Sequence, residues 1–305
     1  MSTDNDAGCR DGFSRGCQTL NYRPILSVDV EDWLQSTWDR EAPIGEVARK
    51  NTLALLERLD RLDVRVTMFI LGKFAETFPD VVREIMDAGH EIAAHGHGHQ
   101  EIFTQTREQF REDIRRNKDH LEQLTGKEVA GFRAPDFSIV KDSIWALEEL
   151  AEAGFIYDSS IFPVDGGRYG IPQWPLAPGS IKLGNGKSII EFPITAYPVG
   201  GKNRAVGGGG YHRLLPGFMI RLIMKKVLDE RPFVSYMHPY EFNSNEFHEM
   251  KEQVPFRVKF HQGLFRSRFG PRFDSYVKQF GGTTFSRFLE ENQVPSISID
   301  TIRIG

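Results

Sequence analysis

The stretch VRVTMFILGKFAETFPDVVREIMDAGHEIAAH, residues 64–95, decides the fold class. It begins with the apolar run 64–71, continues with a helical pattern between Pro79 and Gly89, and ends with EIAAH at 91–95. A proline at the start and a glycine at the end are typical of a helix, and the flanking apolar runs are typical of buried strands. A strand, a helix and a strand in this order predict a parallel pair joined by a crossover helix.

The same alternation continues on both sides of this unit. PILSVD at 24–29 reads as an earlier strand, and leucines at helical spacing follow within 51–62. Further helix and strand patterns fill 110–158, and PFVSYM at 232–237 is a late buried strand. Seven or eight such units predict an α/β fold, a distorted (β/α)7–8 barrel, whose chemistry gathers at the carboxyl ends of the strands.

The distribution of residue types along the chain predicts three parts. We expect a disordered leader at 1–22, the barrel at 23–245, and a C-terminal extension at 246–305 packed on the barrel. Within the barrel, 162–212 is rich in glycine, proline and short extended pieces and is expected to be an inserted long loop. The four glycines 207–210 lack the Lys-Ser/Thr of a phosphate-binding loop and are expected to form a flexible lid near the cleft.

Composition narrows the class of protein. The 305 residues are 40% hydrophobic and 26% charged, with a formal net charge of −4, so no basic field favours nucleic acid as a partner. No apolar run approaches the ~20 residues that span a bilayer, and the polar N-terminus does not resemble a secretory signal. We therefore expect a cytoplasmic protein without a transmembrane segment. Cys9 and Cys17 are expected to be reduced surface thiols rather than parts of a disulfide framework.

Reactive residues from distant segments follow the predicted strands. Because the carboxyl ends of barrel strands meet at one pole, these side chains are expected to converge there. They are Asp29, Glu31 and Asp32 after the first strand, His95, His97 and His99 after the third, then Arg133, Asp158 and His238 after later strands.

The segment from His95 to His99, HGHGH, is the sharpest local signal. Two imidazoles four residues apart can reach one metal ion, and the interspersed glycines allow the backbone to bend tightly. A hydrolytic metal needs a third protein ligand, which the acidic cluster 29–32 can supply. The alternatives are a solvated histidine-rich turn and, for the acids, a helix N-terminal cap near Trp33.

Five motifs in order resemble those of the polysaccharide deacetylases, the NodB-homology or carbohydrate esterase family four enzymes. They are SVDVEDW at 27–33, EIAAHGHGH at 91–99, GFRAPDFS at 131–138, FIYDSS at 155–160 and SYMHPYEF at 235–242. RYGIP at 168–172, EFPIT at 191–195 and GGGGYHRLLP at 207–216 resemble an extended branch associated with exopolysaccharide and O-antigen biosynthesis.

The resemblance implies a role for each matching residue. Asp29 falls on the catalytic base, Arg133 on the arginine that holds it, and His238 on the general acid. His95 and His99 fall on the two metal-binding histidines, whereas His97 is not a ligand position and is expected to support the site or lie at the surface.

Two positions stay open. The third metal ligand is Glu31 or Asp32, and a related spacing in the family favours Glu31. Asp158 is expected either to orient His238 or to cap a turn through its neighbouring serines.

The implied reaction is hydrolysis of the acetamido group of an N-acetylated amino sugar, in a polysaccharide or a lipid-linked glycan precursor. The expected cofactor is a divalent metal ion, Zn²⁺, and a backbone N–H near Arg133 or Ala134 is expected to stabilise the oxyanion. Aromatic candidates for contact with the sugar are Trp33, Trp38, Phe137, Tyr169, Tyr211 and Tyr240.

Other readings remain at this stage. The same scaffold is suited to a deformylase or another linear or cyclic amide hydrolase, and a carbohydrate-binding homologue without activity is a further alternative. The aromatic-basic segment 256–273 either contacts a membrane surface or a partner glycosyltransferase, or packs in the core.

Overall fold

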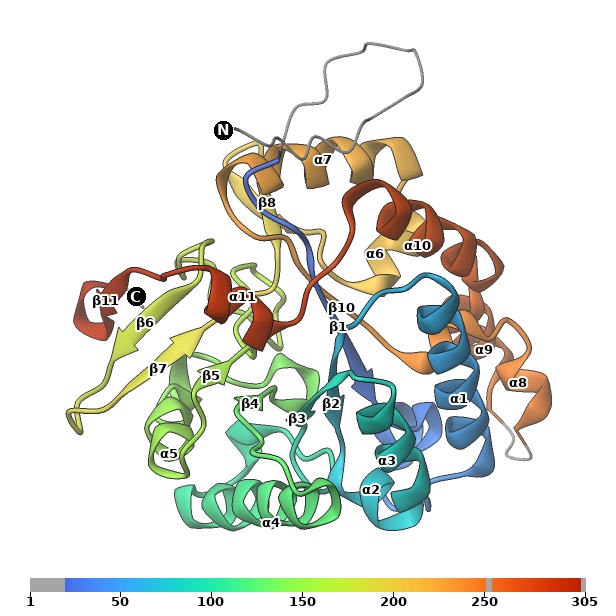
Figure 1. Cartoon of the computed structure of the whole chain (residues 1–305), viewed down its shortest axis with the longest axis horizontal. Coiled ribbons are helices and arrows are strands. Elements are labelled where there is room, and N and C mark those ends of the chain that lie inside the picture. Colours follow the sequence, from blue (N-terminus) through green and yellow to red (C-terminus); the bar gives the residue numbers. More distant parts are fainter. Residues whose placement is uncertain (1–19, 251–253, 303–305) are drawn as a thin grey trace, which may run out of the picture.

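A distorted parallel barrel forms the centre of the molecule. The computed structural model describes residues 20–250 and 254–302. Within this part of the chain one sheet has the order β10-β1-β2-β3-β4-β5-β7-β6-β11, and its first seven strands are parallel (Figure 1). These strands are β1 (Ile25–Val30), β2 (Thr67–Ile70), β3 (Glu91–Ala94), β4 (Gly131–Phe132), β5 (Tyr157–Asp158), β6 (Gly179–Lys182), β7 (Ser188–Glu191), β10 (Val234–Met237) and β11 (Ser296–Ser298).

Irregular hydrogen bonds close the barrel between β7 and β10. The chain beyond β7 reaches Thr195, whose N–H donates to the carbonyl of Val234 (3.1 Å). Gly207 N–H donates to the Thr195 carbonyl (2.9 Å), and Tyr236 N–H donates to the Gly207 carbonyl (2.9 Å). The expected α/β class and distorted barrel are therefore confirmed.

Eleven helices are found in the described residues, and most surround the strands (Figure 1). They are α1 (Glu46–Arg61), α2 (Gly72–Thr77), α3 (Pro79–Asp87), α4 (Arg107–Thr125), α5 (Ala146–Glu152), α6 (Gly209–Leu214), α7 (Gly217–Glu230), α8 (Glu246–Glu249), α9 (Phe256–Gly263), α10 (Arg266–Phe280) and α11 (Phe285–Glu291). None of these helices combines the length and the apolarity that crossing a bilayer requires.

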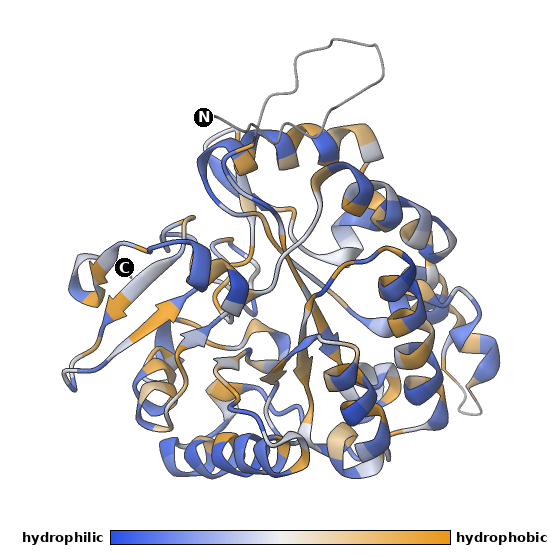
Figure 2. Ribbon diagram, in the orientation of Figure 1, coloured by the Kyte–Doolittle hydropathy of each residue, from blue (hydrophilic) through white to orange (hydrophobic). Residues whose placement is uncertain are grey.

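Helix α4 illustrates how local sequence sets the element. Thr106 and Gln109 form a reciprocal capping box at its start, and Gly126 in the left-handed conformation (φ 68°) ends it. Phe110, Ile114 and Leu121 recur at helical spacing and are fully buried. Each such side chain contributes about 1.5–3 kcal/mol by leaving water, which fixes this face of α4 on the sheet. Figure 2 shows the resulting contrast between hydrophobic strands and the hydrophilic exteriors of the helices.

The C-terminal extension fills the amino end of the barrel. Phe285 of α11 stacks on Tyr157 of β5 with ring centroids 4.9 Å apart, and it also contacts Phe69 and Phe192. Its N–H donates to the hydroxyl of Thr67, the first residue of β2 (3.2 Å). The extension is thus part of the barrel core and supports the strands from the pole opposite to their carboxyl ends.

Residues 162–212 are more integrated than an inserted loop would be. They supply the barrel strand β7, the strand β6 antiparallel to it, and a hairpin of β8 (Ala196–Val199) and β9 (Lys202–Ala205). The expected lid at 207–210 is wrong, because Gly207 to Gly209 are buried at the barrel closure. A Cβ on Gly207 would lie 2.6 Å from the carbonyl oxygen of Val234, so only glycine fits this close approach.

The ends of the chain differ from the expected outline in two places. Of the expected leader at 1–22, residues 1–19 lie outside the described residues, and with them Cys9 and Cys17; Leu20 and Tyr22 pack against the apolar cluster of α7. At the other end, β11 of the extension pairs with β6 at the sheet edge and not within the barrel.

Candidate active site

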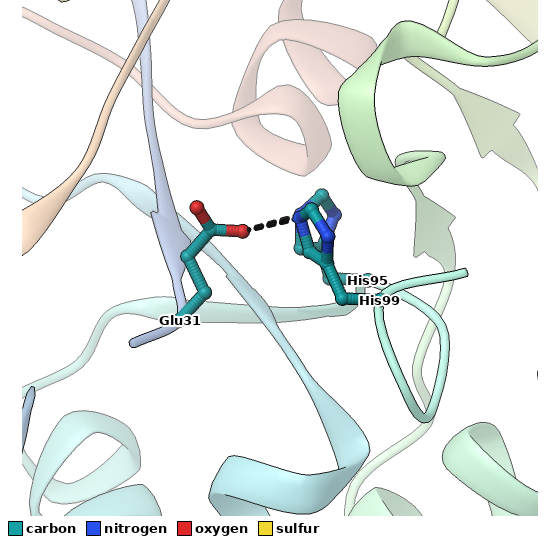
Figure 3. A group of neighbouring side chains, drawn as sticks. All are labelled: Glu31, His95 and His99. Carbon is teal, nitrogen blue, oxygen red and sulfur yellow. Dashed lines mark ion pairs between the residues drawn. The ribbon is translucent and has the colours of Figure 1, made fainter. Parts of the chain in front are cut away.

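Three buried side chains converge just beyond the ends of β1 and β3. Glu31 follows β1, and His95 and His99 follow β3. Glu31 Oε2 lies 2.7 Å from His99 Nε2 and 3.3 Å from His95 Nε2, and the three ligand atoms lie within 4.8 Å of one another. Figure 3 shows the carboxylate facing the two imidazoles. The motif and the acidic cluster therefore meet as the sequence predicts.

The donor set fits a divalent metal ion. The Nδ1 of His95 lies 2.9 Å from the backbone carbonyl of Arg133, so this nitrogen donates and Nε2 is left as a ligand. Glu31 Oε2 is buried and has no hydrogen-bond partner among the described residues. A buried carboxylate oxygen without a donor is costly unless a cation occupies the space beside it. Two imidazoles and one carboxylate are a ligand set that zinc prefers.

The turn that carries the histidines holds unusual backbone angles. Gly96 has φ 71°, which favours glycine, and His99 has φ 60°, which is uncommon for a residue with a Cβ. Arg40 donates to the His99 carbonyl (2.8 Å) and to the carboxylate of Asp136 (2.8 Å), which is itself left-handed with φ 53°. Arg40 thus stabilises two strained residues at the mouth of the site.

Asp29 and Arg133 form a buried pair behind the histidines. Arg133 NH1 donates to Asp29 Oδ1 and to the hydroxyl of Ser27, both at 2.7 Å. Its Nε and NH2 donate to the carbonyl (3.0 Å) and the hydroxyl (2.9 Å) of Ser159. Because Arg133 is fully buried and each of its three side-chain nitrogens donates a hydrogen bond, Asp29 has one fixed oxygen, and Oδ2 is left without a bond to this arginine.

His238 lies across the pocket from these groups. It follows β10, and its Nε2 is 3.5 Å from Glu31 Oε1 and 3.9 Å from Asp29 Oδ2. Burial lowers the pKa of His238, but the bond to Glu241 and the charges of Glu31, Glu241 and Asp29 outweigh it and raise the pKa from 6.5 to about 9. The imidazole is therefore held protonated near neutral pH and can donate a proton.

Glu241 is the residue that orients His238. Its Oε2 lies 3.4 Å from His238 Nδ1 and accepts the His238 backbone N–H (3.1 Å). Its other oxygen, Oε1, pairs with Arg213 Nε of α6 at 3.2 Å. Sequence reasoning missed Glu241, although the three-residue spacing in HPYE places both side chains on one helical turn.

The C-terminal extension holds Arg213 in turn. The guanidinium of Arg213 donates to the carbonyls of Gln262 (2.8 Å) and Leu264 (3.2 Å), which lie at the junction of α9 and α10. A Cβ on Gly209 would overlap the Glu241 carboxylate, so glycine permits α6 to approach it. His238 is therefore positioned by a chain of contacts that reaches residues beyond 245.

The two carboxylates Asp29 and Glu31 and the three imidazoles of His95, His99 and His238 line one pocket, which has a volume of about 150 Å³. Of the aromatic candidates for sugar contact, Phe137, Tyr169 and Tyr240 line it, and Tyr236 joins them. Trp33 is buried against Phe247 instead, and neither Trp38 nor Tyr211 lines this pocket. The full lining is Asp29, Glu31, Thr37, His95, His99, Ala134, Asp136, Phe137, Arg168, Tyr169, Tyr236, His238 and Tyr240.

Asp32 does not join the metal cluster. Its Oδ1 accepts the Leu34 N–H (2.8 Å) and its Oδ2 accepts the Gly45 N–H (2.7 Å). Both oxygens are thus used in holding the loop after β1, as the capping alternative predicts. Among the described residues, Glu31 is the carboxylate that groups with the two histidines.

Asp158 does not contact His238 and does not line the pocket, so the prediction that it orients this histidine is wrong. Its Oδ1 accepts the hydroxyl of Ser160 (2.5 Å) and its Oδ2 accepts the Ser160 N–H (3.1 Å), as the turn alternative predicts. Burial raises the pKa of Asp158 and, together with the charge of Asp158, raises that of Glu191 well above its usual value. The charge on one of these carboxyls therefore disfavours ionisation of the other.

Two further expectations concern donors near the site. The N–H groups of Arg133 and Ala134 donate to the carbonyl of Ala94 (2.9 Å) and to the hydroxyl of Ser160 (2.8 Å), so neither is left for an oxyanion. His97 turns away from the ligands, with Nε2 3.7 Å from Glu76. It lies outside the pocket, as expected for a position that is not a ligand.

Comparison with known families divides the chain near residue 157. The sequence model described as Polysaccharide deacetylase matches residues 31–155. This part of the chain is similar to that family. A second model, described as a domain of unknown function (DUF3473), matches residues 159–290. The first match includes Glu31, His95, His99 and Arg133, and the second match includes His238 and Glu241.

Curated proteins similar to this chain include a peptidoglycan deacetylase-like protein of Gibberella zeae, 44% identical over 110 residues, or 35% of this chain and 31% of the relative. The peptidoglycan deacetylase of Helicobacter pylori is 28% identical over 177 residues, or 55% of this chain and 54% of the relative. The chain thus spans about half or less of the length of these proteins.

Solved structures support the fold. A protein of Mycobacterium smegmatis assigned to the polysaccharide deacetylases has a TM-score of 0.61 at 19% identity, with 93% of each chain covered. The PuuE allantoinase has a TM-score of 0.56 at 14% identity, with 99% of this chain and 96% of that chain covered. At these identities the likeness shows the barrel alone.

Proposed function

We propose that this protein is a metal-dependent N-deacetylase, which hydrolyses the acetamido group of an N-acetylated amino sugar in a glycan. One observation supports this most directly: Glu31, His95 and His99 converge in the same small pocket as the Asp29–Arg133 pair and His238. The pocket thus combines a metal ligand set, a carboxylate with one unbonded oxygen and a protonated imidazole. Amide hydrolysis needs all three, because water is a poor nucleophile and an amine is a poor leaving group.

Glu31, His95 and His99 would hold the divalent ion, which we propose to be zinc. Such an ion supplies Lewis-acid polarisation of the acyl oxygen and lowers the pKa of a coordinated water. Tyr240, whose hydroxyl donates to Glu31 Oε1 (3.4 Å), and Arg133, whose carbonyl accepts from His95, orient two of the three ligands.

Asp29 and His238 handle the protons in this proposal. Arg133 occupies Asp29 Oδ1, so Oδ2 is the atom that accepts a proton from the attacking water. His238 donates a proton from Nε2 to the departing sugar nitrogen, while Glu241 stabilises the charge on its ring from Nδ1. The rings of His238 and Tyr240 are stacked (4.6 Å, 10°), which fixes the plane from which the proton is delivered.

We further propose that the glycan belongs to exopolysaccharide or O-antigen assembly, as a polymer or on a lipid carrier. The support is the set of sequence pieces at 168–172, 191–195 and 207–216, which build the pocket rim, the β7 region and the barrel closure.

Release of acetate by the purified protein tests the proposal. A panel of N-acetylated and N-formylated oligosaccharides is incubated with the protein as purified, after chelation, and after chelation followed by zinc. The proposal predicts acetate release that chelation abolishes and zinc restores. Formate release without acetate release would assign the site to a deformylase. Glycan binding without release of either acid, by protein that contains one metal ion per chain, would indicate a binding protein.

A further inference from the structure

Helices α6 and α7 present a hydrophobic face to solvent. Leu214 is 52% exposed, Phe218 64%, Met219 39% and Leu222 57%. The opposite side of α7 packs in the core through Ile220, Met224, Val227 and Leu228. The α7 helix is therefore apolar on two sides, and packing within this chain explains only one of them. Large exposed apolar side chains this close together mark a surface that another phase or molecule covers.

Basic residues follow directly along the same helix. Lys225 and Lys226 are exposed one turn after Leu222, and Arg221 lies half-buried between the apolar positions. The two acids of α7, Asp229 and Glu230, stand at its C-terminal end. The three basic residues of α7 outnumber its two acids, whereas the whole chain has a formal net charge of −4. We call Leu214, Phe218, Met219, Leu222, Lys225 and Lys226 the α7 face.

The α7 face continues into a recess that leads toward the active-site pocket. The recess has a volume of about 430 Å³ and lies between the β8–β9 hairpin and α7. Met219 and Ile223 form part of its α7 side, and Val199 and Tyr197 form part of its hairpin side. Tyr169 lines both this recess and the active-site pocket. The apolar surface and the candidate catalytic groups therefore share a wall.

We infer that the α7 face docks this protein on an anionic lipid surface. An interfacial helix buries apolar side chains at the level of the acyl chains and uses lysines against anionic headgroups, and the α7 face has both in adjacent turns. Figure 2 shows hydrophobic and hydrophilic residues alternating along α7. A glycan suits this face less well, since aliphatic side chains leave sugar hydroxyls without hydrogen-bond partners.

Vesicle co-sedimentation of the full chain tests the inference. The vesicles are phosphatidylcholine alone or phosphatidylcholine with phosphatidylglycerol, and the variants are F218S/L222S and K225E/K226E. The matched control is F256S/F260S on α9, which removes two phenylalanines that are 80% and 61% exposed on the other aromatic-basic surface.

We expect binding to the anionic vesicles that falls at high salt. F218S/L222S should lower the partition coefficient at least tenfold, and K225E/K226E at least 25-fold, because each lysine near an anionic surface contributes about fivefold. F256S/F260S should leave it unchanged.

Three results would overturn the inference. First, the wild-type protein stays in the supernatant with anionic vesicles. Second, F256S/F260S abolishes vesicle binding while F218S/L222S does not. Third, light scattering shows a soluble dimer that F218S/L222S dissociates. Acetate release from a soluble oligosaccharide is measured in parallel. Phe218 and Leu222 lie outside the active-site pocket, so F218S/L222S should release acetate at the wild-type rate. If the wild type releases no acetate, that result counts against the proposed deacetylase and not against docking.

Discussion

The pocket has two walls that are built in different ways. Glu31, His95 and Arg133 lie at the ends of β1, β3 and β4. These strands belong to the parallel run β1-β2-β3-β4, whose register brings the carboxyl ends together. His238 also follows a strand, but its position depends on Glu241, on Arg213 and on carbonyls between α9 and α10. The metal-and-base wall is thus a product of regular sheet geometry, and the acid wall is a product of irregular contacts that reach the end of the chain. The two walls should fail separately when mutated.

The largest effect is expected from Glu31→Gln on the metal wall. The substitution keeps the shape but removes the negative charge from the ligand set, so bound metal should fall well below one ion per chain. Acetate release should drop on the order of 10³-fold or more. Elemental analysis and initial rates measure the two quantities together.

Asp32→Asn is the matched control for this prediction. Asp32 lies beside Glu31 in sequence but accepts two backbone N–H groups, so the variant should keep its metal and lose about 1 kcal/mol of stability. Metal loss in Asp32→Asn with metal retained in Glu31→Gln would reverse the ligand assignment.

His238→Ala breaks the acid wall alone. The nearest groups of the metal wall are 3.5 Å and 3.9 Å away and have other anchors, so metal content should stay at the wild-type level. The rate should fall about 10²–10³-fold, the usual contribution of a positioned proton donor. Unchanged turnover at full metal occupancy would remove His238 from the mechanism.

Glu241→Gln should have a smaller effect on the same wall. The amide keeps a hydrogen-bonding group near His238 but loses the charge that raises its pKa, so kcat should fall about 10- to 100-fold with little change in KM. His238 must be protonated to act, so activity is lost as pH rises through its pKa of about 9. Lowering that pKa moves the alkaline limb of the rate profile to lower pH. A profile with an unmoved alkaline limb would contradict the role of Glu241.

Asp158→Asn should have the smallest effect, because Asp158 belongs to neither wall. Acetate release should stay within about threefold of wild type, as it has no contact with the reacting groups. The folded pKa values of Asp158 and Glu191 are raised, so the native state binds more protons and the free energy of unfolding falls as pH rises above about 4.5. Asp158→Asn should make this fall shallower in denaturant titrations between pH 5 and 8. A steeper fall would contradict the coupling of Asp158 with Glu191, and a loss of activity beyond tenfold would restore Asp158 to the site.

The sequence predicts the metal wall better than the acid wall for a physical reason. Strand and helix periodicity is local, and the parallel barrel that follows from it carries Asp29, His95 and Arg133 to one pole. The partner of His238 is not determined by periodicity: Asp158 and Glu241 are both plausible carboxylates, and only the closure between β7 and β10 separates them. The same closure explains why the glycines at 207–209 are packing positions and not a lid.

The pairing of the strands within residues 162–212 could not be predicted from local periodicity either. Short extended pieces rich in glycine and proline do not indicate their pairing partners, so β7 could not be recognised as a barrel strand from its own four residues. Its neighbours in the sheet supply that information, together with the parallel hydrogen bonds to β5.

Arg133 supports the metal ligands and the base with different parts of its own structure. Its backbone carbonyl fixes the ring of His95, and its guanidinium fixes one oxygen of Asp29. A substitution at position 133 removes the guanidinium and keeps the carbonyl. The position of the base can therefore be tuned at this residue without removing the main-chain contact that orients a metal ligand.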